Sequence, residues 1–157
     1  MKVSLWYIGK SKQDFIKEGI AFYKKKLLHY AKFDIQEYSK IKVGKNDDPA
    51  KHKKIEADFL LDKIPSNAFL VLLDEKGKQL DSIKFSGWIE TQMVSSPKDI
   101  VFLIGGAYGF DQSLYSRADH KISLSSMTFS HQIIRVAFLE QLYRAFTIIK
   151  GEKYHNV

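Results

Sequence analysis

Residues 101–110 read VFLIGGAYGF, and this stretch decides the fold. An apolar run that ends in two glycines is typical of a buried strand whose backbone turns sharply at its carboxyl end. Ligands of open α/β sheets bind at such strand ends. A second stretch, ISLSSMTFSH at 122–131, indicates a short strand, a loop rich in hydroxyl groups and a helix start. Two adjacent loops without an acidic metal cluster predict a site for a small polar cofactor held by main-chain groups.

The rest of the chain alternates between predicted strands and helices. Strands are expected at 3–8, 33–38, 68–73, 100–104 and 121–124, and helices at 12–30, from Pro49, from Asp81 or Ser82, and at 130–150. Residues 39–48 are expected to form a loop and residues 74–78 a turn. This α/β alternation favours a mostly parallel sheet with helices on both faces. Without a repeat or linker, residues 1–157 are expected to form a single domain.

The predicted last helix carries apolar side chains on more than one face, whereas a surface helix normally shows one apolar stripe. Its polar face is narrow and is expected to hold Arg135, Glu140 and Arg144. We therefore expect a homodimer in which this helix packs on its own sheet and on a second subunit. A helix enclosed within one chain is the alternative. The apolar positions are Ile133, Ile134, Val136, Ala137, Phe138, Leu142, Tyr143, Ala145 and Ile149.

The charge and the residue composition of the chain restrict the classes of function that it can have. The net charge of +7, with 25 lysines and arginines, favours a polyanionic partner such as nucleic acid over a merely basic surface. The absence of cysteine excludes disulfides, thiolate metal sites and cysteine nucleophiles. No signal peptide or apolar run long enough to cross a membrane is present, so a cytoplasmic protein without a membrane partner is expected.

The glycine loop and the histidines restrict the site. Residues 105–109 lack both the dinucleotide fingerprint and the phosphate-loop lysine, and taken alone they indicate a tight turn that requires positive φ. None of the five histidines has a metal-ligand spacing, so no metal is expected. His29 and His52 lie in lysine-rich helices and are expected to be solvated. His131 opens the last helix, whose positive end favours a neutral imidazole; a locally satisfied helix-start residue is the alternative.

The chain ends in a short aromatic and basic tail. Gly151 is expected to cap the last helix, and Lys153, Tyr154 and His155 follow it. Such a tail either frays or stacks on RNA bases and contacts phosphates.

Several stretches together carry a resemblance to a known family. They are LDEKGK at 73–78, FLIGG at 102–106, LSSMTFSHQ at 124–132, Arg135, EQLYRA at 140–145, and Tyr154 with His155. Over the whole chain, including Gly9 and Lys10, the sequence resembles the ribosomal RNA large-subunit methyltransferase H family of the SPOUT superfamily.

The resemblance implies a fold, a cofactor and a substrate. The fold is an α/β domain with a deep trefoil knot near the carboxyl terminus, an exception among unknotted chains. The reaction is methyl transfer to N3 of pseudouridine 1915 in 23S rRNA, by a homodimer acting on assembled ribosomes. The implied cofactor is S-adenosylmethionine, bound by Leu73, Gly105, Leu124, Ser125, Ser126, Met127, Thr128 and Phe129.

The chemistry needs a group that takes the imide proton of N3 and a cation that stabilises the resulting anion. His131, Arg135, Tyr154 and His155 are the candidates, and no single general base is assigned among them. A surface salt bridge is the alternative for Arg135. Two other functions stay open: an RNA-binding module without enzymatic activity, and a SPOUT methyltransferase of tRNA or another rRNA base.

Overall fold

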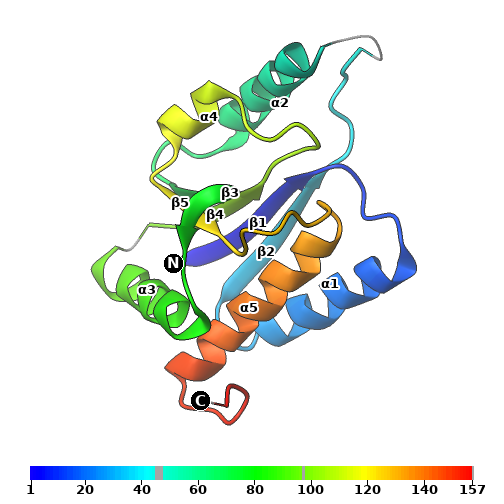
Figure 1. Ribbon diagram of the computed structural model, residues 1–157. Helices are drawn as coiled ribbons and strands as arrows, with labels where there is room; N and C mark the ends of the chain where they lie inside the picture. The colour runs from blue at the N-terminus through cyan, green and yellow to red at the C-terminus, as the bar shows by residue number, and fades with distance from the viewer. Residues whose placement is uncertain (45–47, 97, 157) are drawn as a thin grey trace.

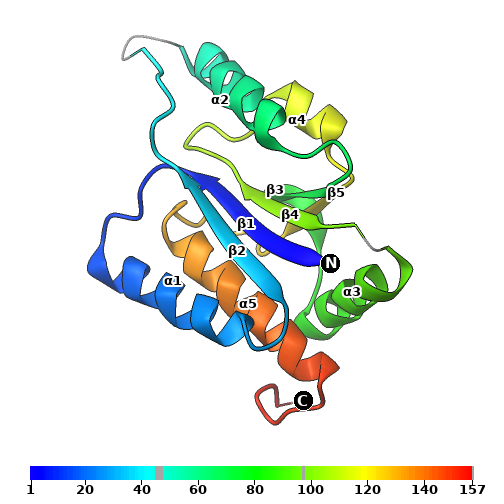
Figure 2. The same cartoon turned by 180° about the vertical axis from the view of Figure 1, so that it is seen from behind.

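The computed structural model describes residues 1–44, 48–96 and 98–156. Its sheet has the strand order β2-β1-β4-β3-β5, and every pairing is parallel. Helices α2 and α4 cover one face of the sheet, and α1, α3 and α5 cover the other (Figures 1 and 2). The predicted α/β architecture is thereby confirmed. The elements are β1 (Lys2–Ile8), α1 (Asp14–Leu27), β2 (Lys32–Tyr38), α2 (Pro49–Lys63), β3 (Phe69–Gln79), α3 (Ser82–Ser95), β4 (Ile100–Ile104), α4 (Gln112–Arg117), β5 (His120–Ser123) and α5 (Ile133–Ile149).

The central strands are apolar because helices cover both of their faces. All five residues of β4 are buried, and successive side chains enter opposite layers of the core. Phe102 packs with Phe138 of α5 on one side, while Leu103 packs with Leu60 of α2 on the other. The sheet therefore places the carboxyl end of β4, at Ile104, beside Leu73 of β3.

One local prediction is wrong, and one helix was not predicted. Residues 74–78 are not a separate turn, because β3 continues to Gln79 with a register shift against β5, where Leu73 and Lys78 both align with Ile122. A Cβ on Gly77 would lie 2.7 Å from the Ile122 backbone, so this close approach requires glycine. Helix α4 was not predicted, because its six residues are too few to show helical periodicity.

The predicted helix boundaries agree better with the structure. Asp48 caps α2 ahead of Pro49, and Asp81 caps α3. Gly151 has φ of +70° directly after α5, as expected of a helix-ending glycine. Of the predicted loop 39–48, residues 45–47 lie outside the described part of the chain. The trefoil knot stays a prediction. None of the helices in the described ranges is long and apolar enough to cross a membrane.

Candidate active site

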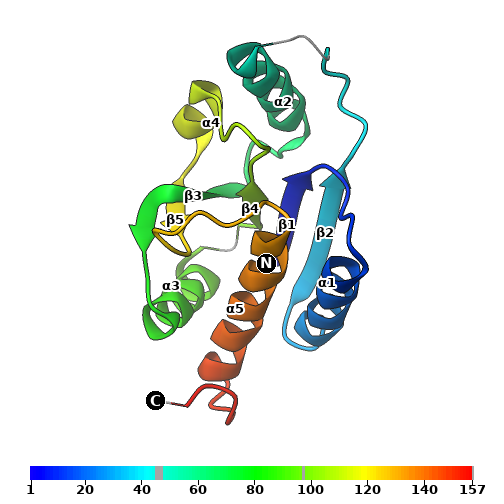
Figure 3. The ribbon, with the colours of Figure 1, turned by 45° about the vertical axis from the view of Figure 1, so that its right-hand side comes forward.

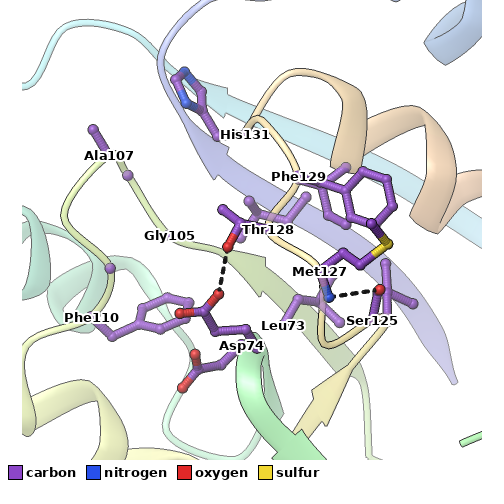
Figure 4. A pocket seen from close by; sticks show the side chains of 16 residues that line it. Leu73, Asp74, Gly105, Ala107, Phe110, Ser125, Met127, Thr128, Phe129 and His131 are labelled. Atoms are coloured by element: carbon purple, nitrogen blue, oxygen red, sulfur yellow. Dashed lines mark hydrogen bonds between the residues drawn. The ribbon is translucent and has the colours of Figure 1, made fainter. Parts of the chain in front are cut away.

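A pocket of about 240 Å³ lies at the carboxyl ends of β4 and β5, beside residues 73–75 of β3 (Figure 4). It contains most of the predicted cofactor residues and also His131, but Ser126 is exposed and does not line it. The two loops at 105–110 and 124–130 thus line one pocket, at the carboxyl ends of the strands, where ligands of open α/β sheets bind. The predicted residues that line the pocket are Leu73, Gly105, Leu124, Ser125, Met127, Thr128 and Phe129.

Hydrogen bonds shape the hydroxyl-rich loop that follows β5. The Ser125 hydroxyl accepts from the Met127 amide at 3.0 Å, and the Ser123 hydroxyl donates to the Ser125 carbonyl at 2.8 Å. The Thr128 hydroxyl donates to Glu75 at 3.3 Å, which ties the loop to β3 (Figure 4). The loop therefore has a defined backbone conformation around the pocket.

Two pocket carboxylates, Asp74 and Glu75, are absent from the predicted set. The Tyr115 hydroxyl donates to Asp74 at 2.6 Å. Burial, together with this bond, raises the pKa of Tyr115 well above its usual range. The sequence signal was their position directly after Leu73, at the end of the apolar part of β3. They make one side of an otherwise apolar pocket suitable for a cationic group.

The glycine loop contains the positive φ that was expected of a tight turn, at Gly109, with φ of +81°. Gly105 and Gly106 do not have positive φ, and both pack closely against their neighbours. A Cβ on Gly105 would lie 3.1 Å from the Phe110 ring, and one on Gly106 would lie 2.5 Å from Glu56 Oε2. The space beside Gly105 is thus filled by Phe110, itself a wall of the pocket.

Glu56 and His52 of α2 support the glycine loop from behind. The Glu56 side chain is only 5% exposed, and its Oε1 lies 3.1 Å from His52 Nε2. The His52 ring in turn packs edge-on against Tyr108 at 5.3 Å between centroids. The His52 side chain is thus only partly solvated, at 33% exposure, whereas His29 is exposed as expected. Burial raises the pKa of Glu56, and the nearby His52 partly opposes that rise.

His131 stands just before α5 and lines the pocket. Partial burial lowers its pKa, and the positive charges of Arg135 and Lys12 lower it further. The expected neutral imidazole is thus favoured. The pKa of His131 is lowered mainly by burial and by two neighbouring cations, and not by the helix end alone.

Arg135 does not lie on an exposed polar face, as its helical position predicted, because it is fully buried. Within the described ranges it forms no ion pair, so the surface salt bridge is not formed, and its part in the reaction stays a prediction. Its guanidinium donates to the Ile8 carbonyl and to the Ser11 hydroxyl, each at 3.0 Å, and lies 4.0 Å above the Tyr7 ring. Arg135 does not line the pocket but joins α5 to the end of β1.

The carboxyl-terminal tail folds back on α5 and does not fray. The Tyr154 hydroxyl donates to Glu140 at 3.0 Å, and Arg144 lies 3.1 Å from His155 Nδ1. Arg144 also pairs with Glu140 at 2.6 Å, as their spacing predicted. Glu140 stands nine residues after His131, about 13 Å along the chain at helical rise, so a tail held at Glu140 and Arg144 does not contact its own His131.

The family profile described as "Predicted SPOUT methyltransferase" matches residues 1–155. The chain belongs to the SPOUT methyltransferase family. Proteins named ribosomal RNA large subunit methyltransferase H are similar to this methyltransferase over nearly their whole length. The one from Parabacteroides distasonis is 46% identical over 99% of both chains. The one from Cytophaga hutchinsonii is 48% identical over 99% of this chain and 100% of its own.

The described part of this SPOUT methyltransferase has no group of three or more histidine, aspartate or glutamate side chains that could hold a metal ion. The residues at the site that were not predicted from the sequence are three carboxylates. Asp74 and Glu75 face the pocket, and Glu56 lies behind the glycine loop. The burial of Glu56 could not be predicted from the sequence, because Glu56 follows a lysine-rich stretch of α2.

The raised pKa of Glu56 makes the methyltransferase's stability depend on pH. The folded state keeps the proton at pH values where the unfolded state has lost it, so stability falls as pH rises from the ordinary glutamate pKa through the raised one. We expect Glu56→Gln to be about 1 kcal/mol more stable than the wild type at pH 7, because no charge is then buried. Denaturant unfolding at pH 7 and pH 4 should show the gain only at pH 7. Exposed Glu90→Gln is the control, and a loss of stability for Glu56→Gln at pH 7 would contradict the expectation.

Proposed function

We propose that the chain is a cytoplasmic, S-adenosylmethionine-dependent methyltransferase that methylates N3 of pseudouridine 1915 in the 23S rRNA of assembled ribosomes. The observation that carries the proposal is the pocket, which brings Leu73, Gly105 and the 124–129 loop together at the strand ends. These are the positions that the resemblance implies for the cofactor. The names of the full-length relatives support the large-subunit rRNA as the substrate.

The pocket suits S-adenosylmethionine chemically. The apolar walls, among them Ile104, Phe110 and Leu124, match a purine and its neighbouring carbons, while Asp74 and Glu75 match the cationic end. When bound, the sulfonium supplies an activated methyl group, so no protein nucleophile is needed. The protein's share is to exclude water and to align donor and acceptor in line.

His131 is the candidate proton acceptor at this pocket. Its neutral imidazole has a free lone pair for the imide proton of N3, and it lies on the pocket wall. Tyr154 and His155 remain candidates for stacking on the target base and hydrogen-bonding it. The proton step is not assigned to one of these side chains alone. Arg135 contributes a buried positive charge next to His131 rather than a direct contact.

A homodimer would complete this site. A groove of about 670 Å³ runs between α3 and α5 and shares Leu124, Phe129 and Ile134 with the cofactor pocket. Next to it, Met127 and Phe129 are 74% and 45% exposed, an apolar surface that a second subunit would cover. Two antiparallel α5 helices across a twofold axis would bring the tail of each subunit to the pocket of the other.

We expect a dimer of about twice 18.1 kDa by light scattering at micromolar concentration. Introducing a charge at the groove, for example by Ala137→Glu, should give monomers because a carboxylate would be buried in the interface. Exposed Val94→Glu on α3 is the control. A monomeric wild type would contradict the dimer and leave the groove without an occupant.

The proposed function itself is tested with labelled S-adenosylmethionine and ribosomes that lack the methyl group. Label should enter large-subunit rRNA. Transfer to tRNA instead would favour the other SPOUT activity, and absence of cofactor binding would favour an RNA-binding module.

A further inference from the structure

The loop that joins β1 to α1, residues 9–13 (Figure 3), is hydrogen-bonded to Gln132, directly before α5. The Gln132 side chain binds its backbone twice: its Oε1 accepts from the Lys12 amide at 3.2 Å, and its Nε2 donates to the Lys10 carbonyl at 3.0 Å. Gln132 is 8% exposed, so water competes little for these bonds. The backbone on which Lys10 and Lys12 stand is therefore tied to the helix that follows His131.

The other side of the loop is fixed as well. Arg135 donates to Ser11, and the Ser11 hydroxyl donates to Glu37 of β2 at 3.1 Å. The Gly9 amide donates to the Tyr38 carbonyl at 2.8 Å, and Gly9 has φ of +92°, which only glycine adopts freely. The loop is thus held in place before any substrate arrives, which reduces the entropy lost on binding.

The two lysine side chains on this loop have no acidic partner. Lys10 and Lys12 are exposed, and neither forms an ion pair within 4.0 Å across the described ranges. By contrast, Lys54 pairs with Asp58 at 3.4 Å and Lys84 with Asp81 at 3.7 Å. The loop does not line the pocket itself, but Gln132, to which it is bonded, directly follows the pocket residue His131. The charge of Lys12 also lowers the pKa of His131.

We propose that Lys10 and Lys12 bind backbone phosphates of the rRNA next to the target nucleotide, and that Gln132 and Arg135 fix the loop for this contact. The proposal rests on the proposed function. Phosphate contacts position a nucleic acid without reading its sequence, and each one releases counterions. A rigid basic loop beside the pocket would set the register of the strand, so that the extruded base meets His131.

The test is steady-state methyl transfer to unmethylated ribosomes by Lys10→Ala/Lys12→Ala. Each lost phosphate contact lowers the association constant about eightfold near 0.1 M salt, so KM for ribosomes should rise by roughly 10- to 60-fold. The slope of log affinity against log salt should become shallower by about 1.4 to 1.8. The value of kcat at saturating ribosomes and the affinity for S-adenosylmethionine should stay near wild type, which also shows that the variant folds.

Two further variants sharpen the result. Lys10→Arg/Lys12→Arg keeps both charges and should keep the low KM. Lys32→Ala/Lys63→Ala removes two lysines from the other end of the strands, where β2 begins and α2 ends, and should leave KM and the salt slope unchanged. An unchanged KM and slope for the alanine pair, or a lower kcat with unchanged KM, would overturn the proposal. If the wild type itself transfers no methyl group, the proposed function fails instead.

Discussion

Deleting residues 154–157 is expected to reduce methyl transfer to background while folding, dimerisation and cofactor binding stay near wild type. The tail does not line the pocket of its own chain and folds back on the carboxyl-terminal half of α5. In the proposed dimer it would supply base contacts to the pocket of the neighbouring subunit. Labelled cofactor on unmethylated ribosomes measures the loss. Deletion of residues 156–157 alone is the matched control, because it keeps Tyr154 and His155.

The structure refines this prediction. Removing Tyr154 also takes away a hydrogen bond to Glu140, although the Glu140–Arg144 pair remains. The cost to stability should be about 1 kcal/mol, too small to unfold the chain. If the truncated protein methylates ribosomes fully, the tail has no catalytic part. If it loses cofactor binding, the tail closes the cofactor pocket and does not contact RNA.

Replacing Gly105 with valine is expected to weaken S-adenosylmethionine binding by 10- to 100-fold or more, since overpacking a filled site costs about 1–3 kcal/mol. The first added carbon already meets the Phe110 ring at 3.1 Å, and Phe110 is a pocket wall. Calorimetry on the folded variant measures the change. Gly87→Val on α3, where an added Cβ has nothing within 4 Å, is the control.

Gly105→Ala serves as a milder second variant if the valine protein does not fold. It should give a smaller loss of affinity in the same direction. Unchanged affinity in a folded Gly105→Val protein would remove the glycine loop from the cofactor site.

The two variants combine into a test of the subunit arrangement. A hybrid dimer of one tail-deleted subunit and one Gly105→Val subunit holds one intact pocket facing one intact tail if tails act across the interface. Mixing the two inactive proteins should then restore methyl transfer. If each tail served its own pocket, every mixture would stay inactive.

The central strands were predictable because a strand buried on both faces must be apolar throughout, as β4 is. The end of β3 was not. Residues 74–78 contain four charged side chains around a glycine, which is typical of a turn, and only pairing with β5 keeps them extended. Helix α4 was too short for its periodicity to be seen. Local sequence thus predicted the strands whose burial makes them apolar. It did not predict the part of β3 that depends on pairing with β5, or the short helix α4.

The cofactor loops were predictable from the strand-end rule together with the family resemblance. The role of Arg135 was not, because its partner Ile8 lies 127 residues away in the sequence. Helical spacing placed Arg135 with Glu140 and Arg144, but its guanidinium is inserted between α5 and β1. Glu56 escaped for a similar reason, since its packing against Gly106 depends on how α2 lies over the sheet.

The most direct test of the central claim is mass-spectrometric mapping of 23S rRNA from cells with and without the gene. We predict that the methyl group on N3 of pseudouridine 1915 is present with the gene, absent without it, and restored by the wild-type protein but not by the protein lacking residues 154–157. Persistence of that methyl group without the gene, or loss of a methyl group from a different nucleotide, would contradict the account.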